Sequence, residues 1–427
     1  MEVAEEDFVL IYHSDATDNP GGADAAYVKE IDEFVEKISG ELWAVNKYIH
    51  DNPELGDEEH KAHALLTNFM KSRGGWKVTP SAYGIATAWV AVFDTGKKGP
   101  VVSFNVEMDA LPRIGHACGH NLIATSSLAG GLATAEIMQS HSIKGKVVIF
   151  GTPAEEGGGG KIRLLEAGAY HEHGVDVSLI SHPGISRDSA LVHTAAYTQF
   201  EVEYFGRAAH AANRPWQGIN ALDALVVAYN ALSVLRQQTM PGDVIQGHIT
   251  DGGRAPNIIH AHAAGTFVAR AGSATRLREL RRKVDACFRA GAEATGARLQ
   301  VAQVQEYADH VPNQVLGTCF ARYWNSLCPP GGVPMGHEVV SVNASTDQGN
   351  ISHVMPSMSV SFAIPPGREG GGPHSPDFAA SAGTREAFWR CLRTGKALAG
   401  TALDVLTTEG LLSEVKRQWE RDMDSSH

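Results

Sequence analysis

The chain has 427 residues and a formal net charge of −12, with 43% hydrophobic and 20% charged residues. This length exceeds what one hydrophobic core usually serves, so two domains are expected in a protein of ordinary globular composition. The acidic balance argues against nucleic acid or an anionic membrane surface as a partner. No apolar run approaches the ~20 residues that a membrane-spanning helix requires.

The amino-terminal segment and the cysteines bear on where the protein works. Residues 1–24 are acidic and end in Asn19-Pro20-Gly21-Gly22, which predicts a loose arm. A secretory signal would instead need a basic start and an apolar stretch. The five cysteines are odd in number and lack the spacing of a disulfide framework, which favours a reducing compartment. We therefore expect a cytoplasmic protein.

The first part of the chain has the pattern of a parallel α/β sheet. Apolar residues recur at three- and four-residue steps from Tyr27 to Ile49, which predicts a long amphipathic helix. Later apolar runs predict buried strands that alternate with helices. The strands are expected at 101–104, 147–150 and 175–180, and the helices between them at 122–138 and near 162–167.

From about Leu191 the pattern changes to strands with one polar face. Phe200, Val202 and Tyr204 alternate with polar residues, as in a half-buried strand. The whole segment follows the order strand-helix-strand-strand-helix-strand, which is ferredoxin-like. After the first strand, helices are expected at 219–236 and 275–294, and strands at 244–249, 266–271 and 299–304.

These patterns predict an α/β fold in two parts. Residues 1–190 and 309–427 are expected to form a catalytic domain with a mixed, largely parallel sheet flanked by helices, ending in a helix at 384–402. Residues 191–308 are interpreted as an inserted ferredoxin-like α+β lid or dimerisation domain.

The densest group of reactive side chains follows the first two predicted strands. Cys118 and His120 offer a thiolate and an imidazole, which suit a zinc-like ion. Glu155 and Glu156 offer one carboxylate to hold a metal and one to move a proton. A Cys-x-His pair can be a coincidence, and a Glu-Glu pair can be a solvated loop. Parallel sheets, however, bind ligands beyond the carboxyl ends of their strands, so this shared position predicts a metal-activated hydrolase.

Three further residues are candidates by position. Asp109 either forms a turn or, as its neighbours favour, orients a metal ligand. His182 ends the third predicted strand, where it either closes a turn or, as we favour, ligates the metal. His374 is distant in sequence, and its spacing alone assigns it no role.

Two other classes of site do not fit the sequence. Gly157–Gly160 and Lys161 look like a phosphate-binding loop, but Glu155 stands where its first glycine belongs and no Ser or Thr follows the lysine. A serine hydrolase of the elbow type would need Gly-x-Ser-x-Gly, which does not occur in the chain.

Eight short motifs occur in order along nearly the whole chain: Asn52–Leu55, Met108–Pro112, His116–His120, Pro153–Gly157, Gly206–Ala211, Ala255–Ile259, Ser345–Asn350 and His374–Phe378. Together they resemble the di-metal peptidases and amidohydrolases of peptidase family M20. The resemblance is strongest to the branch of aminoacylase-like amidohydrolases, hydrolases of auxin–amino-acid conjugates and cytosolic dipeptidases of the β-alanyl-lysine type.

The resemblance implies a role for each matching residue. Glu155 would be the general base, and His210 would contact the substrate carbonyl. Asn257 would contact the substrate carboxylate, and we hypothesise from its position that the nearby Arg254 helps to hold it. In the family such lid residues reach the neighbouring subunit's site, which implies a homodimer. Two divalent ions, Zn or Mn, would be held by five ligands, the first of them bridging: Cys118, His120, Glu156, His182 and His374.

The implied activity is metal-dependent hydrolysis of an amide bond in a small, carboxylate-bearing substrate. The metal pair would activate water, and Glu155 would take its proton and return it to the leaving amine. Either a dipeptidase or an N-acyl-amino-acid amidohydrolase fits this description. An amide-forming enzyme, or a non-catalytic member that binds a small molecule, is the alternative.

Four residues depart from the pattern of the auxin-conjugate hydrolases. Asn121 and Glu107 stand where those enzymes carry Asp, Lys161 stands where a small residue is common, and His260 replaces a usual proline. Asn121 favours the dipeptidase-like branch. Because all five ligand positions are suitably filled, the departures concern the substrate class more than the metals.

Overall fold

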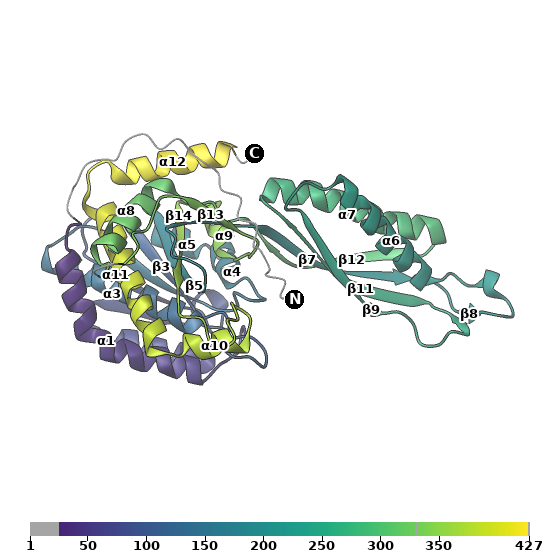
Figure 1. The fold of residues 1–427 in the computed structure, drawn as a ribbon, viewed down its shortest axis with the longest axis horizontal. Coiled ribbons are helices and arrows are strands. Elements are labelled where there is room, and N and C mark those ends of the chain that lie inside the picture. The colour runs from purple at the N-terminus through teal and green to yellow at the C-terminus, as the bar shows by residue number, and fades with distance from the viewer. Residues whose placement is uncertain (1–24, 330–331, 426–427) are drawn as a thin grey trace. The chain divides into compact units, whose positions relative to one another are not determined.

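The computed structural model describes residues 25–329 and 332–425, so the arm predicted at 1–24 lies outside the described residues. The described chain divides into two compact units (Figure 1). The second unit comprises residues 194–309 and 343–345, and the first comprises the described residues on either side of them.

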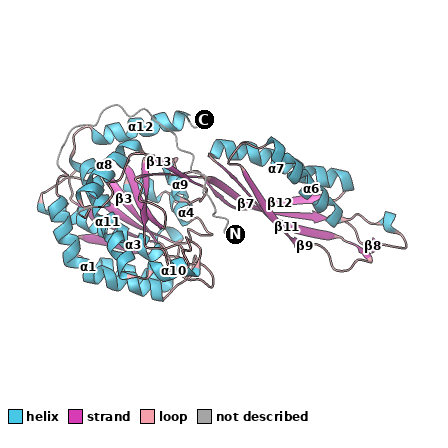
Figure 2. Cartoon of the chain, viewed as in Figure 1, coloured by secondary structure: helices cyan, strands magenta, loops and turns pink. Residues whose placement is uncertain are grey.

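The first unit contains a six-stranded sheet. Helices surround its strands (Figure 2). The pairs β4–β3, β3–β5 and β5–β14 run parallel, whereas β1–β2 and β2–β4 run antiparallel. The predicted mixed, largely parallel sheet is therefore confirmed. In spatial order its strands are β1 (Trp76–Pro80), β2 (Trp89–Asp94), β4 (Lys146–Thr152), β3 (Val101–Glu107), β5 (Val177–Gly184) and β14 (Ser357–Ala363).

Helices cover both faces of this sheet because successive residues of a strand point to opposite sides. Phe104 and Ile149 pack into one core, and Val148 and Phe150 pack into another. The first core includes residues of α1 (Val28–Asp51), α2 (His60–Lys71), α3 (His120–Ser140), α8 (Gln314–Ser326), α10 (Pro376–Ala382), α11 (Arg385–Thr407) and α12 (Leu411–Ser425). The second includes residues of α4 (Gly160–Glu166), α5 (Ala169–His173) and α9 (Gln348–Ser352).

Helix α3 is buried along nearly its whole length, which its small residues permit. A Cβ added at Gly130 would lie 2.8 Å from the Phe104 ring and 3.2 Å from the carbonyl oxygen of Gly395. The helix therefore packs directly against β3 and α11. This contact fixes the position of its first residue, His120, beside the end of β3.

The second unit is a four-stranded antiparallel sheet in the order β12-β7-β11-β9, with α6 and α7 on one face (Figure 1). This is the predicted ferredoxin-like order. Phe200, Phe267 and Phe288 meet in its core. The elements are β7 (Ala196–Phe205), α6 (Ala221–Leu235), β9 (Val244–Asp251), β11 (His262–Ala271), α7 (Ala274–Thr295) and β12 (Arg298–Tyr307).

Smaller elements complete the chain. A hairpin of β8 (Ala209–His210) and β10 (Ile258–Ile259) extends from the second unit, and β6 (Leu191–Thr194) pairs with β13 (Val339–Val342). None of the helices in the described part of the chain has the length and apolar character needed to cross a membrane.

Candidate metal centre

Reactive side chains of the first unit gather at the carboxyl edge of its parallel strands. Asp109 follows β3, Glu155 and Glu156 follow β4, and His182 lies near the end of β5. His374 precedes α10, in the segment that follows β14. Neighbouring parallel strands end at the same edge, so residues far apart in sequence meet there, as the sequence predicts.

The turn into α3 adds Cys118 and His120 to this edge. Gly119 between them has a φ of +78°, and a Cβ there would lie 2.5 Å from Cγ of Pro183, so only glycine fits. Cys118 Sγ lies 3.3 Å from His182 Nε2. His182 Nδ1 donates to the Pro183 carbonyl at 2.8 Å, which leaves the Nε2 lone pair facing the thiol.

The five predicted ligands form two overlapping groups of three, and Cys118 belongs to both. One group adds His120 and His182, the other adds Glu156 and His374, and the potential ligand atoms of each lie within 4.8 Å of one another. Thiolate, imidazole and carboxylate together are a donor set suited to zinc-like ions. The structure thus brings all five predicted ligands together.

Two ligand atoms of this cluster are buried without a hydrogen bond. Neither His120 Nε2 nor Glu156 Oε1 has a hydrogen-bond partner among residues 25–329 and 332–425, although Glu156 Oε1 lies 3.3 Å from His374 Nε2, another predicted ligand. Buried polar atoms are nearly always paired, because an unpaired one loses its hydration without compensation. Divalent cations would satisfy both atoms, so the residues present fit a metal centre.

Asp109 connects α3, which begins at His120, to the loop that carries Glu155 and Glu156. Its Oδ1 accepts from His120 Nδ1 at 3.1 Å, and its Oδ2 accepts the N–H of Glu156 at 3.0 Å. Burial opposes ionisation of Asp109, but these partners outweigh it and lower its pKa to about 2. The anion holds a proton on His120 Nδ1 and keeps Nε2 turned toward the cluster. This geometry fits the orienting role that the sequence predicts.

Glu155 is the buried carboxylate beside the cluster. It forms a close group with His120 and Glu156, whose potential ligand atoms again lie within 4.8 Å of one another. Burial and the negative charges of Glu107 and Asp347 raise the pKa of Glu155 well above its usual value. A carboxyl group with a raised pKa can both accept a proton from water and return it.

Glu59 anchors the start of the loop that carries Glu155. Its Oε1 accepts the N–H of Ala154 at 2.8 Å, and its Oε2 accepts from the Thr87 hydroxyl at 2.8 Å. Ala154 has a φ of +55°, an unusual conformation for alanine that this hydrogen bond helps to hold. Burial and the negative charge of Asp109 raise the pKa of Glu59 to about 7.

Lys161 anchors the end of the same loop. Its backbone N–H donates to Asp347 Oδ2 at 2.9 Å, and its ammonium donates to Glu107 Oε1 at 2.6 Å and to Asp347. In the sequence, Glu107 stands out only as a departure from a pattern, Lys161 stands out as a departure and as part of the excluded phosphate loop, and nothing marks Glu59. Asp347 lay within a recognised motif, and that was the one signal for it.

The three predicted substrate-binding residues belong to the second unit. His210 pairs with Ile258 in the small hairpin, and the N–H of Ala211 donates to the Asn257 carbonyl at 3.0 Å. The hairpin therefore brings His210 and Asn257 together. Arg254 lies in the loop between β9 and β10.

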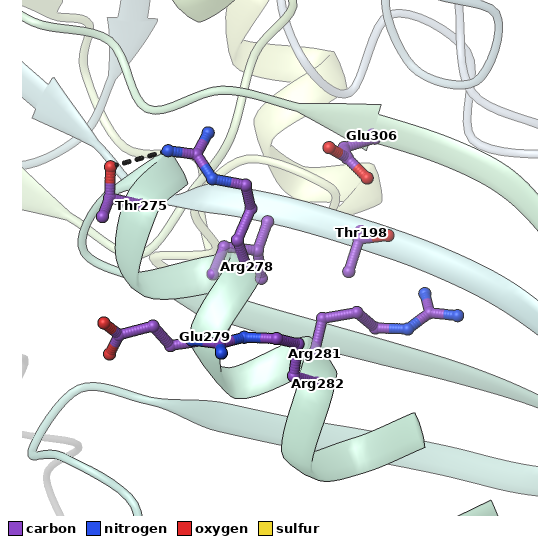
Figure 3. A pocket seen from close by; sticks show the side chains of 8 residues that line it. Thr198, Thr275, Arg278, Glu279, Arg281, Arg282 and Glu306 are labelled. Carbon is purple, nitrogen blue, oxygen red and sulfur yellow. Dashed lines mark hydrogen bonds between the residues drawn. The ribbon is translucent and has the colours of Figure 1, made fainter. Parts of the chain in front are cut away.

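A separate hollow of about 480 Å³ opens on the second unit beside the start of α7 (Figure 3). Several arginines line it, but their guanidinium groups point in different directions (Figure 3). Arg278 donates to the Thr275 hydroxyl, and Arg281 donates to Asp285 and Gln303. Without converging groups, the hollow has no chemistry comparable to the metal-ligand cluster.

The fold and the cluster together define a hydrolase that uses metal ions. Residues 103–393 match the description of peptidase family M20/M25/M40, and the chain belongs to this family. The resemblance stated from the sequence is thereby confirmed.

Relatives and solved structures agree with this assignment. The chain is 37% identical to the Xaa-Arg dipeptidase of Mus musculus, over 94% of this chain and 95% of the relative. It is also 37% identical to the Xaa-Arg dipeptidase of Homo sapiens, over 91% of each. A Bacillus subtilis protein described as a dinuclear metal-binding peptidase of the M20 family has a similar fold, with a TM-score of 0.64 and 18% identity over 87% of this chain and 99% of that one. The protein is thus a hydrolytic enzyme, a metal-dependent dipeptidase or amidohydrolase.

Proposed function

We propose that the protein is a two-metal dipeptidase that cleaves dipeptides whose carboxyl-terminal residue is basic. The main support for the metal chemistry is that Cys118 belongs to two ligand groups at once, with Glu155 beside them. The preference for a basic residue is supported by the two Xaa-Arg dipeptidases to which nearly the whole chain is similar.

In this proposal Cys118, His120 and His182 would hold one cation, and Cys118, Glu156 and His374 would hold the other. Zinc or manganese suits these donors. When bound, such a pair polarises the amide carbonyl and makes water acidic enough to act as a nucleophile at neutral pH.

The side chains of the protein would supply the remaining steps. Glu155 takes the proton of the attacking water and delivers it to the leaving amine, while Asp109 keeps His120 oriented. His210 stabilises the negative charge that develops on the carbonyl oxygen. Asn257 and Arg254 bind the substrate carboxylate.

We further propose that the second unit joins two copies of the chain and brings His210 of one copy to the centre of the other. Helix α6 exposes Val226, Val227, Tyr229 and Val234, and the last of these is 73% exposed. Strand β9 lies at an edge of the sheet. An exposed apolar helix and an open sheet edge are both typical of surfaces that a partner covers.

A cytoplasmic location completes the proposal. All five cysteines are free. Free thiols are retained in reducing compartments, and Cys118 must stay reduced to bind a metal.

A hydrolysis assay tests the substrate class. The purified protein would be offered dipeptides ending in Arg or Lys, matched dipeptides ending in Leu or Glu, and N-acyl amino acids, with Mn²⁺ or Zn²⁺ added. We expect release of free Arg and Lys that a chelator abolishes and fresh metal restores. Cleavage of N-acyl amino acids alone would contradict the dipeptidase assignment.

Paired substitutions separate the base from the ligand. Glu155→Gln should lower kcat by about 10²-fold or more, because the proton acceptor is lost, while bound metal stays at the parental level. Glu156→Ala should lose metal as well as activity. Bound metal is measured by elemental analysis after dialysis. Substantial activity in Glu155→Gln would refute its role as the base.

A further inference from the structure

A second group of buried charges lies beside the metal-ligand cluster, and the proposed function leaves it without a role. It consists of Lys161, Glu107 and Asp347. The side chains of Lys161 and Asp347 are fully buried, and that of Glu107 is 2% exposed. Ionised groups are rarely buried so completely unless they are paired, and here one ammonium contacts two carboxylates.

Two of these residues are departures from the auxin-conjugate hydrolase pattern, and the structure explains them as a pair. By the resemblance stated above, Glu107 stands where those enzymes carry the shorter aspartate, and Lys161 where a small residue is common. The Lys161 Nζ lies 2.6 Å from Glu107 Oε1, so the longer acid and the added ammonium meet. A small residue at position 161 would leave Glu107 and Asp347 facing each other without a cation in the interior.

Glu107 also faces the candidate metal centre. Its Oε2 lies 3.4 Å from His120 Nε2 and has no hydrogen-bond partner in the described part of the chain. Carboxylate oxygens of Glu107, Glu155 and Asp347 lie within 4.8 Å of one another. Three converging carboxylates are a ligand set for a hard divalent cation. The ammonium of Lys161 is bonded to two of the three.

We propose that Lys161 is a positioning residue, a built-in cation that prevents Glu107 and Asp347 from forming an additional metal site with Glu155. In its absence the three carboxylates would share a divalent ion, and Glu155 would serve as a ligand instead of moving a proton. The bond from the Lys161 backbone N–H to Asp347 holds the lysine in place at the start of α4. This inference rests on the proposed function, in which Glu155 is the general base.

Lys161→Met tests the proposal, because methionine fills similar space without a charge. Each variant is dialysed against buffered Mn²⁺, and bound metal is counted per chain. We expect Lys161→Met to bind one more equivalent than the parent and to lose kcat by about 10²-fold, with KM changed less than threefold. The double variant Lys161→Met/Glu107→Gln lacks one carboxylate of the group. It should return to the parental metal content and regain part of kcat.

The outcomes distinguish this proposal from the function on which it rests. A folded Lys161→Met protein with parental metal content and parental kcat would overturn the role of Lys161. If this variant does not fold, Lys161→Gln decides, because it keeps a polar side chain without the charge. We expect it also to bind one more equivalent of metal than the parent and to lose kcat. Parental metal content and parental kcat in a folded Lys161→Gln protein would also overturn the proposal. A parent protein that binds no metal, or hydrolyses no amide, would instead refute the proposed function.

Discussion

Buried hydrogen bonds explain why asparagine stands at position 121, next to the predicted ligand His120. Asn121 Nδ2 donates to Asn46 Oδ1 at 2.9 Å and to the Ala382 carbonyl at 3.0 Å. Aspartate, which the auxin-conjugate hydrolases carry here, has no donor when ionised and would face two acceptors with a buried charge. The sequence interpretation linked this departure to the substrate class, whereas the structure gives it a packing reason, the contact of α3 with α1 and α10.

Glu59 should make the stability of the protein fall as the pH rises. Its pKa is raised from 4.5 to about 7, so the folded state favours its protonated form. The contribution of Glu59 to the free energy of unfolding is present in full below pH 4.5. It is lost as the pH rises to about 7, a change of roughly 3 kcal/mol. Glu59→Gln keeps an acceptor for Ala154 but never ionises. We expect it to exceed the parent in unfolding free energy at pH 8 and to match it near pH 4.5.

Urea unfolding at several pH values measures this difference, because all other titrating groups are shared. The exposed neighbour Glu58 provides the control variant Glu58→Gln, which removes a carboxylate from the same segment outside the core. A Glu59→Gln protein whose advantage does not grow with pH would contradict the account.

At the scale of elements, the turn into α3 carries two of the proposed metal ligands, Cys118 and His120. Gly119→Ala would put a Cβ 2.5 Å from Cγ of Pro183 and strain a φ of +78°. The turn must then shift Cys118 and His120 away from His182. We expect the affinity for metal to fall by about tenfold or more, a loss typical of disturbed ligand supports.

Gly157→Ala is the matched control for this prediction. A Cβ at Gly157 meets no atom within 4 Å, and its φ lies outside the left-handed region. It should bind metal like the parent in a competition titration with a chelating dye. Equal affinities in both alanine variants would show that the turn does not position the ligands.

The elements that the sequence predicts well are those with regular apolar patterns. The predicted helix at Tyr27–Ile49 is α1, and the ferredoxin-like order of the second unit is confirmed. Strand β14 was not singled out, because three serines interrupt its apolar residues and yet are wholly or largely buried. Helices α2, α8 and α12 were also not predicted, and α8 and α12 lie in the stretches that flank the predicted terminal helix.

The residues of the candidate site likewise include some that the sequence predicts and some that it does not. The grouping of Cys118, His120, Glu155, Glu156 and His182 was predictable because strand ends in a parallel sheet converge on one edge, whereas His374 was predicted only from the family resemblance. The bonds of Lys161 were not, since they join it to residues 54 and 186 positions away. No periodic pattern in a sequence records such contacts. The sequence marked Glu107 and Lys161 as unusual, but only the coordinates show that they are partners.

At the scale of the whole molecule, the proposed dimer predicts that two inactive proteins can restore each other. His210→Ala lacks the proposed oxyanion-stabilising group, and Glu155→Ala lacks the proposed base. If His210 serves the neighbouring copy's centre, a mixed dimer contains one centre with both groups intact. We expect up to about one quarter of parental activity after equal mixing and subunit exchange, because half of the dimers are mixed and each has one working centre.

Differently tagged subunits, purified by both tags in succession, verify that mixed dimers have formed. Val234→Glu, which places a charge on the exposed face of α6, should weaken the dimer in analytical ultracentrifugation and prevent recovery. Mixed dimers that remain inactive would mean that each centre is complete within one chain.

The two ends of the second unit lie side by side, since Tyr197 of β7 is paired with Tyr307 of β12. The second unit, a segment of more than a hundred residues, thus begins and ends in neighbouring strands. Because both of its ends lie at one place, such a segment can be inserted, exchanged or lost without a change in the strand order of the larger sheet. Under the proposed roles, substrate choice and bond-breaking chemistry can then diverge separately during evolution.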